Sequence, residues 1–249
     1  MLYLKRVAWL ALLLLAVNIS SAYAQQASLT DDQVQKRLAF IGKALQDGQP
    51  AARRWYYGWM GAYTVGAVAG GILAATHWND TKVEGPETVP DREFAEGMLV
   101  GGGTFFLGVG AMIFDPFTPA TAARKLGRLP GTTPQERLAK LERAEELLRK
   151  CAARERRGRS LTTHLLNLGA NAVSAAVVKA AFHQSWSSAA VTFATGEAIS
   201  LLNIFTQPMK ATRDLKKYEG GNFAGPSARP EAQWSLGFCP GGLSFSLRF

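Results

Sequence analysis

Two segments of the chain repeat apolar residues every three or four positions, the spacing of one face of a helix. The first contains Val34, Leu38, Ile41 and Leu45, and the second contains Leu138, Leu141, Leu148 and Cys151. Each follows a capping box, Thr30-Asp-Asp-Gln33 or Thr133-Pro-Gln-Glu136, in which a hydroxyl and a Gln or Glu side chain satisfy the first amides. The pattern predicts two amphipathic helices, one over 31–47 that ends at Gly48 and Pro50, and one that ends at Gly158.

The residues from Trp55 to Thr76 include no charged side chain over 22 positions, and the residues from Gly97 to Phe114 include none over 18. A membrane-spanning helix needs about 20 apolar residues, and aromatic rings gather at its ends. Trp55, Tyr56, Tyr57 and Trp59 lie at one end of the first run and Trp78 at the other. The two runs predict a membrane hairpin joined by a polar loop over 79–93.

Two further apolar runs, 161–182 and 187–205, flank a polar turn at 183–186. Lys179 interrupts the first near its end and Glu197 interrupts the second near its middle. Two interpretations remain open, a second membrane hairpin and a soluble helical hairpin packed on the first pair.

Small residues follow one face of the first hairpin, where they would let two helix backbones approach closely. The predicted packing residues are Ala62, Gly66, Gly70, Ala74, Gly97 and Gly101.

Polar side chains in the second hairpin gather at matching depths. If the turn is centred between Gln184 and Ser185, Glu197 lies level with Ala172, beside Asn171. The expected polar seam consists of Asn167, Asn171, Glu197, Ser200 and Asn203. An ionisable group inside a membrane is costly and suggests a functional site, but the favoured interpretation is helix-to-helix hydrogen bonding by a protonated Glu197.

Residues near the C-terminus alternate apolar and polar side chains on both sides of Cys239-Pro240-Gly241-Gly242. Period-two alternation around such a turn predicts a β-hairpin. At the other end, Lys5 and Arg6 precede an eleven-residue apolar run and a small-x-small site at Ala22-Tyr23-Ala24. This is the pattern of a cleaved secretory leader, and the alternative is an uncleaved anchor.

The expected organisation is therefore a mainly α membrane protein with two apolar helical hairpins, two amphipathic basic helices and a C-terminal β-hairpin. Its segments are a signal peptide (1–24), an amphipathic helix with a basic linker (25–54), the first hairpin (55–116), a basic linker and helix (117–160), the second hairpin (161–208), and a linker with the β-hairpin (209–249). The leader predicts a bacterial cell envelope, with the inner membrane favoured over the outer.

Composition narrows the function classes. Apolar residues make up 47% of the 249 positions and charged residues 19%, which excludes a disordered chain. Two cysteines exclude a disulfide scaffold, and whether Cys151 and Cys239 pair is left open. The net charge of +9 would suit nucleic acid, but a secreted, membrane-inserted chain favours the bilayer and its anionic headgroups. The exported linker 115–160 would then hold twelve basic residues against six acidic ones, opposite to the positive-inside tendency.

No residue set predicts a reaction. The three histidines lack zinc-site spacing and there is no Gly-x-Ser-x-Gly motif, so we expect no catalytic residues, metal or cofactor. Arg37-Leu-Ala and Ala51-Ala-Arg53 recur 100 and 101 residues later, which suggests an internal repeat. The first functional hypothesis is a non-enzymatic scaffold or interaction protein, whose partner is a second copy or another envelope protein. The alternative is a small transporter or proton-handling protein that uses Glu197.

Overall fold

The computed structural model describes residues 29–223, 233–239 and 242–248; the predicted leader, 1–24, lies outside this part of the chain. The described chain is mainly helical. Its helices are α2 (Asp31–His77), α3 (Glu93–Phe114), the 3-10 turn η1 (Thr118–Ala120), α4 (Ala122–Gly127), α5 (Pro134–Gly158), α6 (Leu161–Ala180), α7 (Trp186–Thr206) and α8 (Lys210–Glu219). Its strands are β1 (Thr81–Glu84), β2 (Glu87–Pro90), β3 (Gln233–Cys239) and β4 (Gly242–Arg248).

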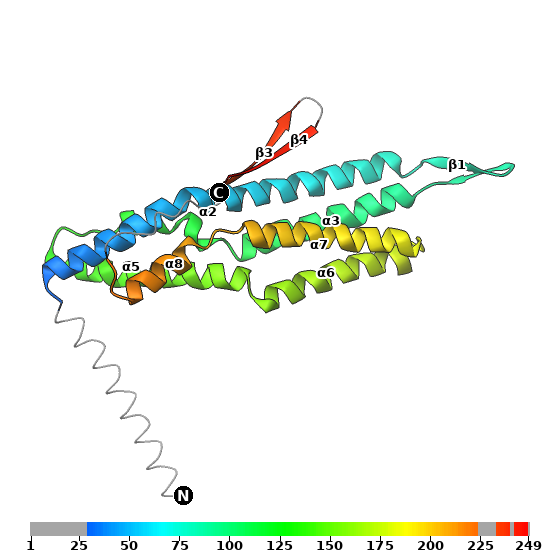
Figure 1. Cartoon of the computed structure of the whole chain (residues 1–249). Coiled ribbons are helices and arrows are strands. Elements are labelled where there is room, and N and C mark those ends of the chain that lie inside the picture. Colours follow the sequence, from blue (N-terminus) through cyan, green and yellow to red (C-terminus); the bar gives the residue numbers. More distant parts are fainter. Residues whose placement is uncertain (1–28, 224–232, 240–241, 249) are drawn as a thin grey trace, which may run out of the picture.

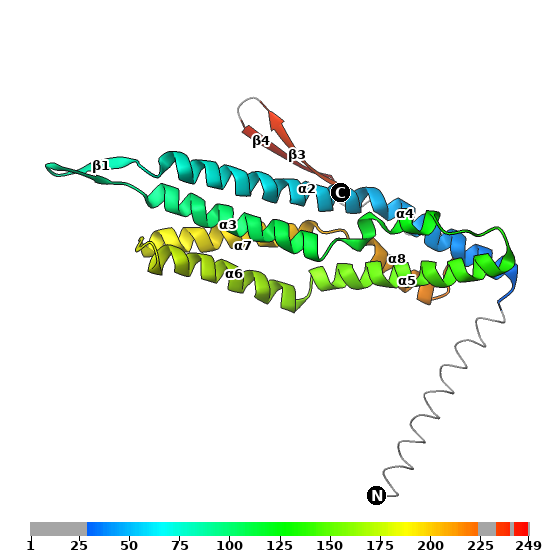
Figure 2. The same ribbon diagram turned by 180° about the vertical axis from the view of Figure 1, so that it is seen from behind.

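The helices form two parts that share α2 (Figures 1 and 2). The apolar bundle consists of α2 from Trp55 onward with α3, α6 and α7. The helical head consists of α2 up to Arg54 with η1, α4, α5 and α8. Four helices are long and apolar enough to cross a membrane, and each belongs in whole or in part to the bundle. Within the apolar 18-residue stretch of each candidate span only 11% of the residues are buried, so most of the bundle surface is apolar and exposed.

Helix α2 corrects one prediction, because it is a single helix of 47 residues that runs through Gly48 and Pro50. The expected boundary at 54/55 therefore falls inside a continuous helix. Contacts on both sides of Pro50 hold it in line: Gln49 donates from Nε2 to the Ala120 carbonyl at 3.2 Å, and Ala52 is buried. Proline disfavours a helix interior by about 3 kcal/mol, and tertiary packing has overridden that preference here.

The core of the head lies between α2 and α5. Both predicted capping boxes are present, at Thr30 with Gln33 and at Thr133 with Glu136, and α5 ends at Gly158 as expected. The Asp31 carboxylate joins the two helix starts through Arg137 at 2.8 Å, and this guanidinium lowers the pKa of Asp31.

Two helices of the head were not predicted. Helix α4 buries Ala122 and Leu126, and α8 buries Ala211, Leu215 and Tyr218 in the core formed with α2 and α5. The spacing of the α8 residues, four and then three, was a helical signal in the segment expected to be a linker.

The expected polar loop 79–93 is an antiparallel ribbon, in which β1 pairs with β2 around Gly85 at φ 64°. It extends beyond the end of the bundle (Figure 1). Near the C-terminus, β3 pairs antiparallel with β4 in the region of the predicted β-hairpin, with Leu236 opposite Phe245.

Candidate functional site

The polar residues of the second hairpin meet where α6 packs against α7. Asn171 is 3% exposed and donates from Nδ2 to Glu197 Oε1 at 2.7 Å and to Ser200 Oγ at 3.2 Å. Glu197 and Ser200 lie one turn apart on the same face of α7, so a single amide links both. This polar triad is the candidate functional site.

A glycine makes room for the triad. A Cβ built on Gly196 would overlap the side-chain amide of Asn171, so only glycine accommodates the observed position of that amide. The sequence gives this glycine directly before Glu197, a signal that the depth argument did not use.

The rest of the expected seam is not joined to the triad. Within residues 29–223, neither the Asn167 nor the Asn203 side chain hydrogen-bonds to Asn171, Glu197 or Ser200. Asn203 instead contributes its carbonyl, which accepts from Trp55 Nε1 at 3.1 Å. We expected the Asn203 side chain in the seam, but Asn203 lies in the last turn of α7, where backbone carbonyls are free to accept.

Lys179 does not pair with Glu197. It donates to the Gln184 carbonyl at 2.9 Å and lies over the Trp186 ring, where it closes the turn between α6 and α7. Beside this turn, Gln184 donates to the Glu93 carbonyl and to Glu96, both at 2.9 Å. The far ends of the two hairpins are thus connected by hydrogen bonds.

The packing residues of the first hairpin are shifted on α3. A Cβ on Gly70 would lie 2.7 Å from the Gly102 Cα, and one on Gly66 would lie 2.6 Å from the Phe105 ring. Ala74 is buried, but Ala62 is exposed. Gly97 and Gly101 are corrections, since a Cβ at either would meet no atom within 4 Å. The residue of α3 that contacts α2 is Gly102, one position after the predicted Gly101. Because residues 101, 102 and 103 are all glycine, the spacing of small residues does not show which of them faces α2.

The bundle joins the head through a layer of specific contacts, here called the junction. At the same level within the bundle, Trp55 and Trp59 of α2 donate to the Asn203 carbonyl and the Thr206 hydroxyl of α7, both at 3.1 Å. From α5, Arg154 donates to the Asp115 carbonyl at the end of α3 at 3.0 Å. Arg159 donates to the Phe205 and Gln207 carbonyls at the end of α7, at 2.9 and 2.7 Å.

A buried carboxylate fixes α8 to the junction. Glu155 is 1% exposed and accepts from the amides of Ala211 and Thr212 at 3.0 and 2.7 Å. These amides belong to the first turn of α8, where free donors and the helix dipole favour a negative charge. Glu155 therefore acts as the N-terminal cap of a helix that lies 56 residues further along the chain.

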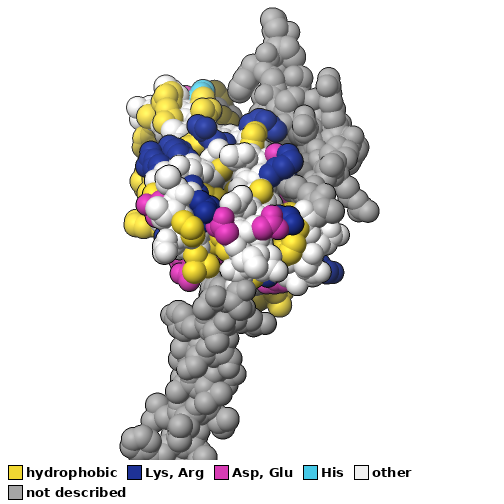
Figure 3. Space-filling model, turned by 90° about the vertical axis from the view of Figure 1, so that its left-hand side faces the viewer, with side chains coloured by type: hydrophobic (Ala, Val, Ile, Leu, Met, Phe, Trp, Pro, Cys, Tyr) yellow, Lys and Arg dark blue, Asp and Glu magenta, His cyan; other side chains and the backbone are white. Residues whose placement is uncertain are grey.

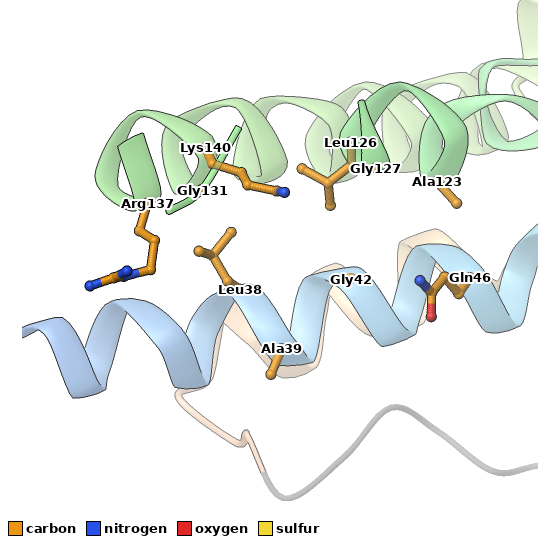
Figure 4. Close-up of a pocket in the computed structure, with 10 residues that line it drawn as sticks. All are labelled: Leu38, Ala39, Gly42, Gln46, Ala123, Leu126, Gly127, Gly131, Arg137 and Lys140. Atoms are coloured by element: carbon orange, nitrogen blue, oxygen red, sulfur yellow. The ribbon is translucent and has the colours of Figure 1, made fainter. Parts of the chain in front are cut away.

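The head has one sizeable hollow among the described residues. It measures about 320 Å³ and lies between α2 and the segment from α4 to the start of α5 (Figure 4). The two basic side chains that line it are engaged, Arg137 with Asp31 and Lys140 with the Leu129 carbonyl. Nearby, Cys151 is free and fully buried, and burial raises the pKa of its thiol to about 12, so this thiol is not a nucleophile at neutral pH.

Within the part of the chain that the structure describes, no group of three His, Cys, Asp or Glu side chains is placed to hold a metal ion. Comparison with protein-family models, with curated proteins and with solved structures finds no match to this chain.

Proposed function

We propose that this chain is an integral membrane protein of the cell envelope that acts as a non-enzymatic scaffold. The apolar bundle anchors it in the bilayer, and the helical head is a rigid platform at the membrane surface that binds a partner. The single observation that carries this proposal is the junction. Because α2 is continuous and α5 donates hydrogen bonds to the ends of α3 and α7, the head cannot move freely relative to the membrane.

We also propose that the chain contains an internal duplication, from which either a helical scaffold or a transporter could arise. Pro119, Ala122, Arg124 and Leu126 recur exactly 89 residues later as Pro208, Ala211, Arg213 and Leu215. These residues begin at or just before α4 and α8, two helices that both bury side chains in the core formed with α2 and α5. The offset is shorter than the earlier 100 to 101 mainly because residues 181–185 replace the longer loop 78–92. Two copies of one unit, both running from head to bundle, would give the parallel repeat that the sequence suggested.

A second candidate function rests on the polar triad. Glu197 lies in the middle of an apolar helix with one hydrogen-bonded partner, an arrangement that membrane proteins use to carry protons or cations. In this alternative, Asn171 and Ser200 orient a carboxyl that binds and releases a proton during transport.

Reconstitution of the full chain into sealed vesicles tests both. The scaffold predicts that the protein resists alkaline carbonate extraction and that proton entry under an imposed potassium diffusion potential equals that of empty vesicles. Recovery in the carbonate supernatant would contradict membrane integration. Proton entry that Glu197→Gln abolishes, with insertion unchanged, would favour the transport function instead.

A further inference from the structure

The ends of four helices meet at one level on the head side of the bundle. Trp55 contacts the Asn203 carbonyl, Tyr56 donates to the Met112 carbonyl at 2.9 Å, and Arg159 reaches the end of α7. The last turns of α3 and α7, the first turn of α6 and the Trp55 region of α2 therefore share a height. Tryptophan and tyrosine prefer the membrane–water interface, so this level marks the headgroup region of one leaflet.

Six arginines of α2 and α5 lie within five residues of Trp55 or Arg159 in the sequence, and they divide into two kinds. Arg154 and Arg159 are committed to carbonyls of α3 and α7. The other four are exposed and form what we call the arginine collar: Arg53 and Arg54 on α2, and Arg156 and Arg157 on α5.

The arginine collar has little internal neutralisation. Arg53 lies over the Tyr57 ring at 5.9 Å, and Arg157 is 3.5 Å from Asp115 with 65% of its side chain exposed. The side chains of Arg54 and Arg156 form no hydrogen bond or ion pair with any residue of the described chain. The Asp115 carboxylate is already paired with Arg154 at 3.1 Å, and Glu155 is buried against α8. Up to four guanidinium groups thus face the headgroups with one shared acid between them.

The opposite end of the bundle provides an internal contrast. There Lys82 pairs with Glu84, Arg92 lies over Trp78, and Lys179 is held by the Gln184 carbonyl. Acidic residues outnumber basic ones across 77–96 by six to two. The two membrane faces of one bundle therefore differ in charge.

We infer that the arginine collar binds the phosphates of anionic phospholipids in the leaflet next to the head. Guanidinium groups suit this ligand because their donors match phosphate oxygens in pairs. Juxtamembrane basic residues are attracted to anionic lipid additively, so four at one height give a preference over zwitterionic lipid. The inference rests on the membrane placement proposed above and adds the lipid class and the residues that recognise it.

The test uses the full chain in phosphatidylcholine vesicles that contain trace spin-labelled phosphatidylglycerol or spin-labelled phosphatidylcholine. The motionally restricted fraction of each label gives a relative association constant. We expect a preference of about threefold or more for phosphatidylglycerol, which falls to about one in the variant Arg53→Gln, Arg54→Gln, Arg156→Gln, Arg157→Gln. High salt should weaken the wild-type preference in the same direction.

The control variant removes four exposed charges from the same two helices, further into the head: Lys36→Gln, Lys43→Gln, Arg149→Gln, Lys150→Gln. It should keep the wild-type preference. An equal loss of phosphatidylglycerol preference in both variants, or no such preference in the wild type, would contradict lipid binding by the arginine collar. Competition by glycerol 3-phosphate at constant ionic strength would assign the site to a soluble phosphate and also overturn it. If the chain does not float with vesicles, the proposed membrane placement is wrong. If it floats but shows no lipid preference, only the lipid inference is wrong.

Discussion

The two helices of each hairpin pack closely against each other, but the residues at the contact differ in chemistry between the hairpins. In the first, Gly70 of α2 lies against Gly102 of α3, and the two backbones touch. In the second, Asn171 of α6 occupies the position 101 residues after Gly70, and it lies against Gly196 of α7. The first pair thus has a glycine on each helix, whereas the second has a glycine on α7 and, on α6, an amide that donates to Glu197. The first contact is apolar and the second is polar.

The two units also differ where the head meets the bundle. Helix α2 passes through this level unbroken despite Pro50, but α5 ends at Gly158 and α6 begins after Ser160. At the break, the Gln207 side chain fills the space beside Gly158, and the Ser160 hydroxyl accepts the Thr163 amide at 3.3 Å. The comparison shows that neighbouring contacts, more than the helix-breaking residue itself, decide where a helix ends.

The largest expected effect is at the glycine contact. Gly70→Ile places a side chain against the backbone of α3, which cannot yield cheaply, so we expect a loss of about 3 kcal/mol or more in detergent stability. Gly71→Ile is the matched control because its Cβ faces open space. The same contrast applies on α3, where Gly102→Ile should destabilise and Gly101→Ile should not. Equal tolerance of both in thermal unfolding would contradict the observed helix pairing.

Substitution of Glu197 tests the polar site. Glu197→Leu leaves the buried Asn171 amide without its 2.7 Å partner, and we expect a loss of about 1–3 kcal/mol. Glu197→Gln keeps a side-chain acceptor and should be close to wild type in thermal stability. Gly196→Ala should destabilise as Leu does, because the new Cβ overlaps Asn171, while Gly169→Ala should not. If Glu197→Leu and Glu197→Gln had the same thermal stability, the Asn171–Glu197 hydrogen bond would not contribute to the stability of the fold.

The helix break and the helix through Pro50 should respond in opposite directions. Ser160→Ala removes the cap of α6 and should lower stability by about 1 kcal/mol. Pro50→Ala restores a backbone amide in the middle of α2 and should raise the unfolding temperature, since alanine strongly exceeds proline in helix propensity. A decrease for Pro50→Ala would mean that α2 needs the proline for its path.

The smallest effect concerns the link between the starts of α2 and α5. Arg137 lowers the pKa of Asp31, so the ionised Asp31 stabilises the folded state above its unfolded pKa. That stabilisation is lost as the pH falls through the lowered, folded-state pKa. Asp31→Asn should therefore lower the unfolding temperature slightly at pH 7, and the difference from wild type should shrink towards zero as the pH falls through the lowered pKa of Asp31. A difference that grows in acid would reverse the assigned sign.

The sequence by itself determined the elements whose signals are local. Both capping boxes, the apolar lengths of the four candidate spans and the end of α5 at Gly158 follow from neighbours three or four residues apart. Counting residues outward in both directions from the turn at 183–186 also placed Asn171 beside Glu197, because an antiparallel hairpin with a short turn has a fixed register.

Tertiary structure decided whatever depends on partners far along the chain. Packing against η1 and α7 keeps α2 helical through Pro50, and the Glu155 carboxylate caps α8 from 56 residues away. Among the adjacent glycines 101–103, only contact with α2 selects Gly102. A local pattern shows which residues can form a helix face, but the free energy that chooses among such faces comes from the surface against which each one packs.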